Sequence, residues 1–313
     1  FAEDYGRVRE EIAKAVVGHD EIVDGVLTCL FAGGHALLEG VPGLGKTLLI
    51  RSLSEALHLQ FNRIQFTPDL MPADVTGTTI VVEADGNREF QFRKGPIFAQ
   101  IVLADEINRA TPKTQSSLLE AMQEKSVTVG GETHILDKPF FVMATQNPVE
   151  QEGTYPLPEA QLDRFMLRHR LDYPTFDQEA EVVRRGLQLK LKRQGDGAVP
   201  MSAFDAIDES SPYHVRDLTQ AMERVLEVHV SDVFVRDCVE LVTLTRSHPD
   251  LELGCSPRAA IALVNASRAR AFIHGRDYAV PEDFLALAED VVLHRIRLNY
   301  EALAEGRRGE DVL

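Results

Sequence analysis

The first half of the chain alternates short apolar runs with segments whose apolar residues recur at helical spacing. Short apolar runs separated by helices are typical of parallel strands that are buried on both faces of a sheet. The pattern therefore predicts an α/β fold between about residues 34 and 171. Its strands are expected at residues 35–38, 61–66, 101–104, 140–144 and 166–171.

The second half shows a different pattern, because strand signals stop after Asp172-Tyr173-Pro174. Apolar residues recur there at spacings of three and four, which indicates amphipathic helices. Gly195-Asp196-Gly197 with Pro200 predicts a loop within this part. We expect an α/β domain over residues 1–172, which starts with a helical segment, and a small all-helical domain over 173–313. The helices are expected near 176–192, 214–225, 232–246, 257–273 and 281–296.

Two β-hairpins are predicted to interrupt the alternation of strands and helices. The first pairs residues 78–82 with 90–93 around an Asp85-Gly86 turn, and the second pairs 127–129 with 133–136 around Gly130-Gly131. Asp-Gly is a strong turn signal between two apolar segments. Either hairpin alone is equally well explained as a surface loop without a function of its own.

Composition excludes several classes of protein. The net charge of −16 disfavours a general nucleic-acid coat or an anionic membrane surface, although a local basic pore stays possible. No apolar run is long enough for a transmembrane helix, and the first residues do not resemble a signal peptide. Cys29, Cys238 and Cys255 are widely spaced and read as buried thiols of a reducing compartment, so we expect a cytoplasmic protein.

A phosphate-binding loop lies between a predicted strand and a predicted helix. The eight residues from Gly40 to Thr47 match GxxxxGK[ST] in full. Glycines let successive N–H groups face one anion, and the helix N-terminus adds a partial positive charge there. Lys46 can reach the β- and γ-phosphates, and the Thr47 hydroxyl can bind Mg²⁺. The predicted nucleotide contacts in this loop are Gly40, Val41, Pro42, Gly43, Leu44, Gly45, Lys46, Thr47 and Leu48.

Polar residues follow two other predicted strands. Asp105 and Glu106 end the strand at 101–104, where ligands bind in open parallel sheets. Asp105 would hold the Mg²⁺ shell, and Glu106 would act as general base toward the attacking water. The strand at 140–144 is followed by Gln146 and Asn147, and Asn147 is our candidate for orienting that water. A turn-forming Asn before Pro148 is the alternative.

Longer blocks of the sequence are close to family signatures. They are LADEINRATPKTQSSLLEAMQE from Leu103, MATQNPVEQEGTYPLPEAQLDRFM from Met143, GCSPRAAIALVNASRARAF from Gly254 and YAVPEDF from Tyr278. Together with the phosphate loop, they make the chain resemble a MoxR-family AAA+ ATPase. The resemblance implies a P-loop NTPase core with a five-stranded parallel sheet, followed by a helical lid. It also implies that the two hairpins are the inserts of a clade that includes magnesium chelatase subunits.

The resemblance assigns roles to residues outside the loop. Val16, Val17 and Gly18 resemble an N-terminal strand that contacts adenine in the family, and Val17 and Gly18 are the candidate contacts, although His19 stands where related sequences often carry Gln. Val16 and Val17 could equally be core residues. Arg164 matches an arginine finger that acts on the neighbouring subunit; an ion pair to Asp163 or Glu159 is the alternative. Arg258 matches sensor 2, which contacts the γ-phosphate in its own or a neighbouring subunit.

The resemblance also implies a function. We expect Mg²⁺-dependent ATP hydrolysis in a ring, most simply a hexamer, which remodels or activates partner proteins that often contain a von Willebrand A domain. Arg109 is a further candidate for the subunit interface, with a surface role equally open. A DNA motor is one alternative, disfavoured by hairpin tips that are acidic or neutral. A nucleotide-gated scaffold with little turnover is another, disfavoured by the presence of both Glu106 and Arg164.

Overall fold

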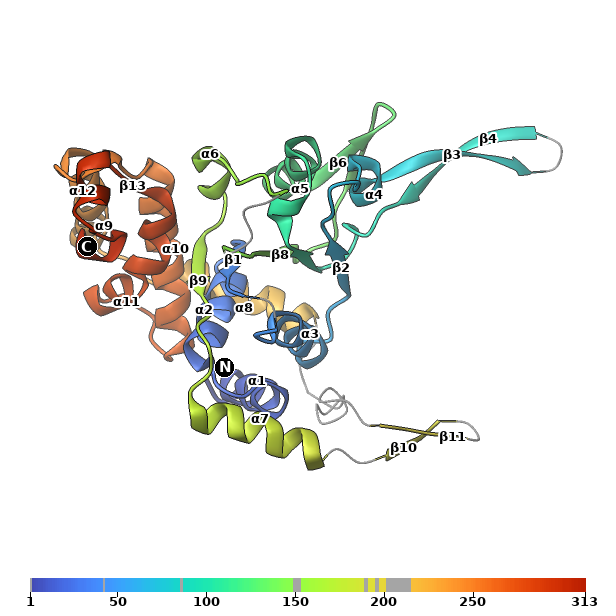
Figure 1. The fold of residues 1–313 in the computed structure, drawn as a ribbon, viewed down its shortest axis with the longest axis horizontal. Coiled ribbons are helices and arrows are strands. Elements are labelled where there is room, and N and C mark those ends of the chain that lie inside the picture. Colours follow the sequence, from blue (N-terminus) through green and yellow to red (C-terminus); the bar gives the residue numbers. More distant parts are fainter. Residues whose placement is uncertain are drawn as a thin grey trace.

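A parallel sheet with helices on both faces forms the centre of the computed structural model, and further helices extend from one side (Figure 1). The structure describes residues 2–41, 43–84, 87–148, 153–188, 191–194, 197–200 and 215–313. Pro42, the turn residues Asp85 and Gly86, and Gly195 and Asp196 lie outside these ranges, so the predictions made for them stay predictions.

The helices and strands follow the predicted order. In the first half they are α1 (Ala2–Ala15), α2 (Asp20–Phe31), β1 (Ala36–Glu39), α3 (Lys46–Ala56), β2 (Phe61–Gln65), α4 (Pro72–Thr76), β3 (Gly77–Ala84), β4 (Asn87–Lys94), β5 (Ile101–Asp105), α5 (Pro112–Glu124), β6 (Ser126–Val129), β7 (Glu132–Ile135), β8 (Phe141–Gln146), α6 (Glu159–Leu162) and β9 (Leu167–Arg170), with a 3-10 turn at Ile107–Arg109. In the second half they are α7 (Phe176–Gln188), β10 (Leu191–Gln194), β11 (Gly197–Pro200), α8 (Val215–Glu227), α9 (Asp232–Ser247), β12 (Leu251–Leu253), α10 (Pro257–Ile273), α11 (Pro281–Val292), β13 (Arg297–Leu298) and α12 (Tyr300–Ala304), with 3-10 turns at Leu293–Arg295 and Gly309–Asp311.

The central sheet has five strands in the order β2-β5-β8-β1-β9, and every neighbouring pair is parallel. The five predicted strands are therefore confirmed. Because all strands run the same way, the ends of β1, β5 and β8 lie at one edge of the sheet, where the phosphate loop and the two carboxylates follow.

Alternate residues of each strand enter different hydrophobic clusters. In β5, Ile101 and Leu103 pack with α1, α2 and α3, whereas Val102 and Ala104 pack with α5 on the opposite face. This division explains why the sequence shows apolar runs without alternation: both faces of the central strands are covered. The first cluster continues without a break into α8, α9, α10 and α11, so the helices of the second half share a core with one face of the sheet.

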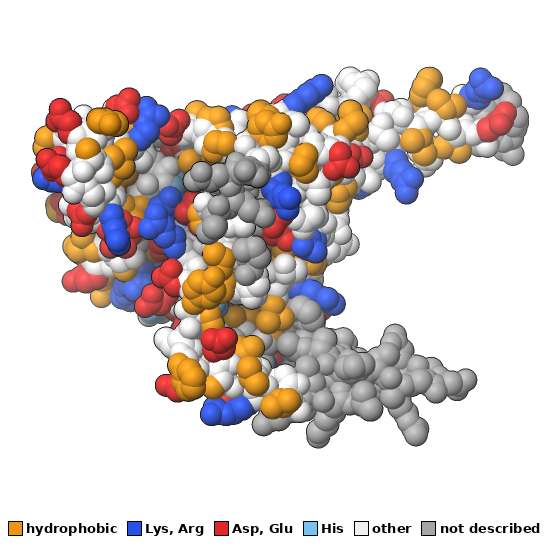
Figure 2. Space-filling view, in the orientation of Figure 1, with side chains coloured by type: hydrophobic (Ala, Val, Ile, Leu, Met, Phe, Trp, Pro, Cys, Tyr) orange, Lys and Arg blue, Asp and Glu red, His pale blue; other side chains and the backbone are white. Residues whose placement is uncertain are grey.

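Both predicted hairpins are present. β3 pairs with β4 and β6 pairs with β7, each antiparallel. The β3–β4 ribbon projects from the body and rests at its base on the second hairpin, where Phe92 stacks on His134 with ring centroids 3.9 Å apart. Farther out on the ribbon, Val81 and Phe90 are cross-strand partners and lie exposed, which places apolar side chains on the projecting arm (Figure 2).

The second half is helical as predicted, but two short antiparallel strand pairs were missed. β10 pairs with β11, and β12 pairs with β13. The expectation that strands stop after Pro174 is therefore wrong at these places. Strands of two to four residues are too short to show a period, and β12 and β13 come together across about 45 residues of intervening helix. None of the helices in the described residues is long and apolar enough to span a membrane.

The N-terminal strand expected at residues 16–18 is not present. Val16, Val17 and Gly18 connect α1 to α2 and form no strand. Val16 is buried in the core cluster, whereas Val17 is half-buried. Gly18 has a φ of +73°, a backbone conformation that a strand does not adopt and that glycine supplies without strain.

A buried histidine ties the sheet to α5. His35 accepts a hydrogen bond from the Val142 N–H at Nδ1 (3.0 Å) and donates from Nε2 to the Met122 carbonyl (3.2 Å). The ring is therefore neutral, and burial lowers its pKa from 6.5 to about 4. Because the folded pKa is below the unfolded one, the unfolded chain takes up the proton first as the pH falls. This stabilisation is present above pH 6.5 and is lost between about pH 6.5 and 4.

We expect acid to destabilise the protein through this group by about 3 kcal/mol over that window. Urea unfolding at a series of pH values measures it. His35→Gln should flatten the dependence on pH, while His229→Gln, at an exposed position, should leave it unchanged. An unaltered slope in His35→Gln would show that other groups account for the acid sensitivity; the buried, neutral His294 is the first to examine.

Candidate functional site

The phosphate loop connects β1 to α3 as its spacing predicted. The Gly40 N–H donates to the Gln146 carbonyl at the end of β8 (3.2 Å), which fixes the start of the loop against the neighbouring strand. Gly43 and Gly45 have φ values of +88° and +78°, and a side chain at either position would be strained. The loop therefore needs these glycines for its backbone path, independently of any ligand.

Lys46 is buried at the centre of this loop. Its Nζ donates to the Gly40 carbonyl at 2.6 Å, and burial lowers its pKa, while the carboxylates of Asp105 and Glu106 act in the opposite direction. The N-terminus of α3 has no side-chain cap and no acidic residue in its first turn. A buried ammonium beside the uncapped amides of a helix fits a phosphate group.

Asp105 ends β5 and is held from two sides. Thr145 Oγ1 donates to its Oδ1 at 2.6 Å, and Arg63 donates to its Oδ2 from Nε (3.1 Å) and from Nη2 (2.6 Å). The carboxylate is nearly buried, with 11% of its side chain exposed. Oxygen ligands of this kind are what Mg²⁺ prefers, so Asp105 together with the Thr47 hydroxyl fits the predicted metal.

Glu106 follows in a left-handed conformation, with φ 55° and ψ 50°. Its N–H donates to Thr145 Oγ1 (2.8 Å), and its Oε2 accepts from Gln65 Nε2 (3.1 Å) and Arg109 Nη1 (3.1 Å). A non-glycine residue in this region is uncommon and marks strain that frequently lies at functional sites. The turn directs Asp105 and Glu106 to different partners, which suits different roles for the two carboxylates.

Three polar residues of this site were missed in the sequence: Arg63, Gln65 and Thr145. Arg63 and Gln65 lie two residues apart on β2, so they share a face of the strand, and Gln65 pairs in register with Asp105. Two long polar residues at strand spacing, Arg63 and Gln65, on a strand predicted to lie in the sheet were the available signal. Thr145, just before the predicted Gln146 and Asn147, is fully buried and links the Asp105 carboxylate to the Glu106 backbone N–H.

The remaining predicted contacts are distributed around the loop. Asn147 is buried directly after β8, and Thr47 and Leu48 are half-buried in the first turn of α3. Gly18 lies beside the Gln178 side chain of α7, since a Cβ at Gly18 would be 2.8 Å from Gln178 Nε2. Gly40 lies beside Leu171 in the same way, at 2.9 Å. The segment that leaves β9 therefore passes the phosphate loop before α7 begins.

The two predicted arginines lie at a different place, around Asp163. Arg164 donates from Nη1 to the Leu119 carbonyl of α5 (2.8 Å), and its buried Nε has no hydrogen-bond partner in the described part of the chain. Arg258 is half-exposed, and its Nη1 lies 3.8 Å from Asp163 Oδ2. The alternative proposed for Arg164, an ion pair with Asp163 or Glu159, is not what holds it here: Asp163 pairs with Arg295 and Glu159 pairs with Arg297.

A buried arginine fixes the backbone on both sides of Arg164. Arg295 donates to Asp163 Oδ1 (2.8 Å), to the Phe165 carbonyl (2.6 Å) and to the Met166 carbonyl (3.2 Å). Ser256, the N-cap of α10, accepts from the Arg258 N–H and donates to Asp163 Oδ2 at 2.8 Å. The lid helices thus hold the segment that carries Arg164 through several hydrogen bonds.

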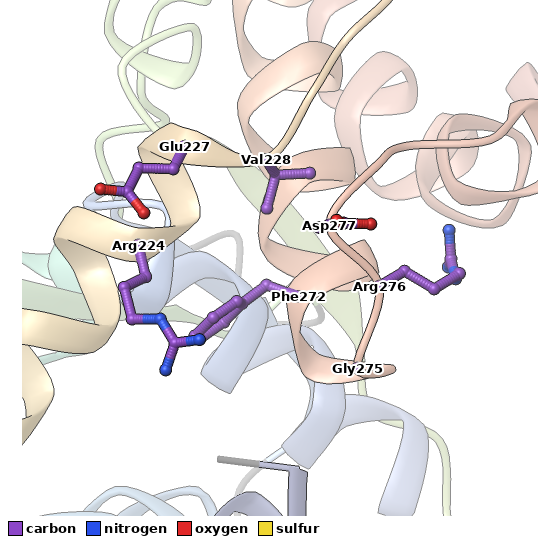
Figure 3. Close-up of a pocket in the computed structure, with 7 residues that line it drawn as sticks. All are labelled: Arg224, Glu227, Val228, Phe272, Gly275, Arg276 and Asp277. Carbon is purple, nitrogen blue, oxygen red and sulfur yellow. The ribbon is translucent and has the colours of Figure 1, made fainter.

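A separate cavity of about 450 Å³ lies between the ends of α8 and α10, and none of the described residues that line it belongs to the phosphate loop (Figure 3). Arg224 lies over the Phe272 ring there, with its guanidinium carbon 5.6 Å from the centroid. Arg276, which follows α10, donates two hydrogen bonds to the Asp283 carboxylate. Glu227 and Asp277 balance the two arginines, so the lining attracts neither anions nor cations by net charge.

Each half of the chain matches a known protein family. Residues 35–167 match the family described as "ATPase family associated with various cellular activities (AAA)", and residues 243–313 match the AAA lid domain. A crystal structure of a provisionally assigned ATPase from Cytophaga hutchinsonii is similar, with a TM-score of 0.86 and 42% identity, over 99% of this chain and 92% of that one. The predicted core and helical lid are therefore confirmed.

Curated relatives match over nearly the whole chain. An uncharacterised Bacillus subtilis protein, YeaC, is 47% identical over 98% of this chain and 91% of its own. Chaperone MoxR1 of Mycobacterium tuberculosis is 40% identical over 94% of this chain and 76% of its own. Protein MoxR of Methylorubrum extorquens is 33% identical over 98% of this chain and 90% of its own.

Proposed function

Because this chain belongs to the MoxR family of AAA+ ATPases, we propose that it hydrolyses ATP with Mg²⁺ and uses the cycle to remodel or activate partner proteins. One observation carries the proposal: a buried lysine in the glycine loop after β1 lies at the same edge of the parallel sheet as the two carboxylates at the end of β5, with only β8 between the two strands. That is the arrangement needed to bind a triphosphate on one side and to activate water on the other.

Each residue has a distinct task in this reaction. Lys46 exchanges the Gly40 carbonyl for phosphate oxygens, and the N–H groups at the start of α3 donate to the same anion. Thr47 and Asp105 would hold Mg²⁺, which neutralises charge on the phosphate oxygens. Glu106 accepts a proton from the attacking water, and Asn147, buried after β8, orients that water.

Arg164 and Arg258 are proposed to act together at a boundary between subunits. Their common neighbour, Asp163, supports this: Arg164 is adjacent in sequence, and Arg258 is within 3.8 Å of its carboxylate. Because Arg164 follows Asp163 in the chain and Arg258 contacts the Asp163 carboxylate, we infer that both arginines serve the same nucleotide, that of the neighbouring subunit. To do so, Arg164 must leave the Leu119 carbonyl.

We further propose that the chain forms a hexameric ring and acts on a protein client, such as one with a von Willebrand A domain. In each subunit, residues 1–172 would form the nucleotide-binding core and residues 173–313 the lid. The exposed apolar pair Val81 and Phe90 on the projecting ribbon supports a protein client, because exposed apolar side chains grouped in this way are typical of protein contacts. ATPase activity that rises with duplex DNA at moderate salt would favour the DNA motor.

The proposal predicts binding that depends on Lys46. Calorimetry should detect association of Mg·ATP with the wild-type protein. Lys46→Ala should weaken it at least about tenfold, since a buried ammonium contributes charge-assisted hydrogen bonds to the phosphates. Lys113→Ala, which removes an exposed lysine of α5, is the matched control and should bind normally. A wild-type protein that is folded and shows no binding would refute the proposed function.

A further inference from the structure

Arg63 occupies the carboxylate that is assigned to the metal. Its Nε and Nη2 both donate to Asp105 Oδ2, and Thr145 donates to Oδ1. A carboxylate has about four lone-pair sites, two on each oxygen. Both sites on Oδ2 are therefore used, and one of the two on Oδ1 is used, so little of the carboxylate is left to accept from a hydrated cation.

We propose that Arg63 is a tethered counter-cation: it neutralises Asp105 while no metal is bound, and it competes with Mg²⁺ for this carboxylate. The inference rests on the proposed function, because it concerns the same site, and it adds a regulation of metal loading. A guanidinium and Mg²⁺ on one carboxylate repel each other, so each weakens the binding of the other.

Asp105 is nearly buried and Arg63 is half-exposed, which is the difference in burial that an exchange of cations on Asp105 requires. The Asp105 side chain is 11% exposed and needs a positive neighbour, because an unpaired charge is costly away from water. The Arg63 side chain is 47% exposed, so its guanidinium can turn into solvent at little cost. Asp105 therefore exchanges one cation for another, and its charge is compensated in both states.

Arg63 has a second hydrogen-bond partner, Gln65, which it can keep after it leaves Asp105. Its Nη2 also donates to Gln65 Oε1, two residues along β2, and Gln65 in turn donates to Glu106. When Mg²⁺ takes Asp105, Arg63 keeps this partner on the same strand. The nucleotide phosphates favour the exchange, since their negative charge raises the attraction of the site for Mg²⁺. Arg63 therefore disfavours metal in the empty site and yields to metal that arrives with phosphate.

Metal binding to the nucleotide-free protein tests this inference separately from ATP hydrolysis. Mn²⁺ as a spectroscopic substitute for Mg²⁺, followed by electron paramagnetic resonance, should bind Arg63→Ala at least about tenfold more tightly than wild type. Arg63→Lys, which keeps the positive charge, should stay within about threefold of wild type. Arg307→Ala is the matched control, because Arg307 is as exposed as Arg63 and pairs with Asp250, outside this site.

Thermal unfolding provides a second readout. Without divalent metal, Arg63→Ala should melt below wild type, because Asp105 lacks its partner. Added Mg²⁺ should restore most of that loss and should change the melting temperatures of wild type and Arg307→Ala little. Equal or weaker Mn²⁺ affinity in Arg63→Ala would overturn the proposal and show that Arg63 orients Asp105 for the metal.

If Arg63→Ala does not fold, Arg63→Gln replaces it, with the same expected gain in Mn²⁺ affinity. Failure of wild type to bind ATP would refute the proposed function, whereas the comparison of Mn²⁺ affinities without nucleotide tests Arg63 alone, so the two failures are distinguishable.

Discussion

Glu106→Gln should bind Mg·ATP with wild-type affinity and release phosphate at least about 100 times more slowly. The amide has the size of the carboxylate but cannot take the proton from water. The backbone should not change, because Gln tolerates the left-handed conformation of position 106 as Glu does. The amide oxygen can still accept from Gln65 and Arg109, the two partners that hold Glu106 in the structure.

Calorimetry and a phosphate-release assay on the same preparation check both parts of this result. Glu55→Gln is the matched control: it removes an exposed carboxylate that is paired with Arg51 on α3, and turnover should stay at the wild-type level. Turnover of Glu106→Gln within about threefold of wild type would show that another group is the base.

Arg164→Ala should lower hydrolysis by about 10³- to 10⁵-fold in the assembled protein, the range expected for an arginine finger. The monomer should lose only about 1 kcal/mol of stability, because Arg164 contributes one hydrogen bond, to the Leu119 carbonyl. A large loss of activity with a small loss of stability is the combination that separates a finger from a structural arginine. Phosphate release and urea unfolding measure the two quantities.

Mixing two inactive variants tests whether the finger acts between subunits. Arg164→Ala keeps Glu106, and Glu106→Gln keeps Arg164. In randomly mixed rings about one quarter of the sites combine an intact Glu106 with a neighbour's intact Arg164, so about that fraction of wild-type turnover should return. Mixtures that stay inactive, although both variants assemble, would show that Arg164 does not act on the neighbouring subunit.

Local chemistry explains why so much of this site was predictable. The path of the loop from Gly40 to Thr47 is set by glycines and by the start of α3, so eight neighbouring residues carry the information. Asp105 and Glu106 were recognisable because they end an apolar run that had to be a buried strand. The hairpins were visible from turn residues between short apolar segments. In each case the residues that interact are close in the chain.

The partners of those carboxylates were not predictable from local patterns. Arg63 reaches Asp105, and Thr145 reaches Asp105 and Glu106, across about 40 residues. Asp163 and Arg295 meet across 132 residues. A single polar residue in a strand or helix has no period and carries no sign of its distant partner. The strand at Val16–Gly18 was wrongly expected because the resemblance supplied it without a local β-pattern.

The amino-acid sequence alone was thus sufficient to locate the glycine loop, the twin carboxylates and the α/β core with its helical extension. Assembly of the parallel sheet was required to bring β2, β5 and β8 side by side, and with them Arg63, Gln65 and Thr145 to the carboxylates. Folding of the lid onto β9 likewise brought Arg295 and Ser256 to the segment of Arg164. The physical reason is that backbone geometry and helix capping act over a few residues, whereas ion pairs form between any charges that packing brings within reach.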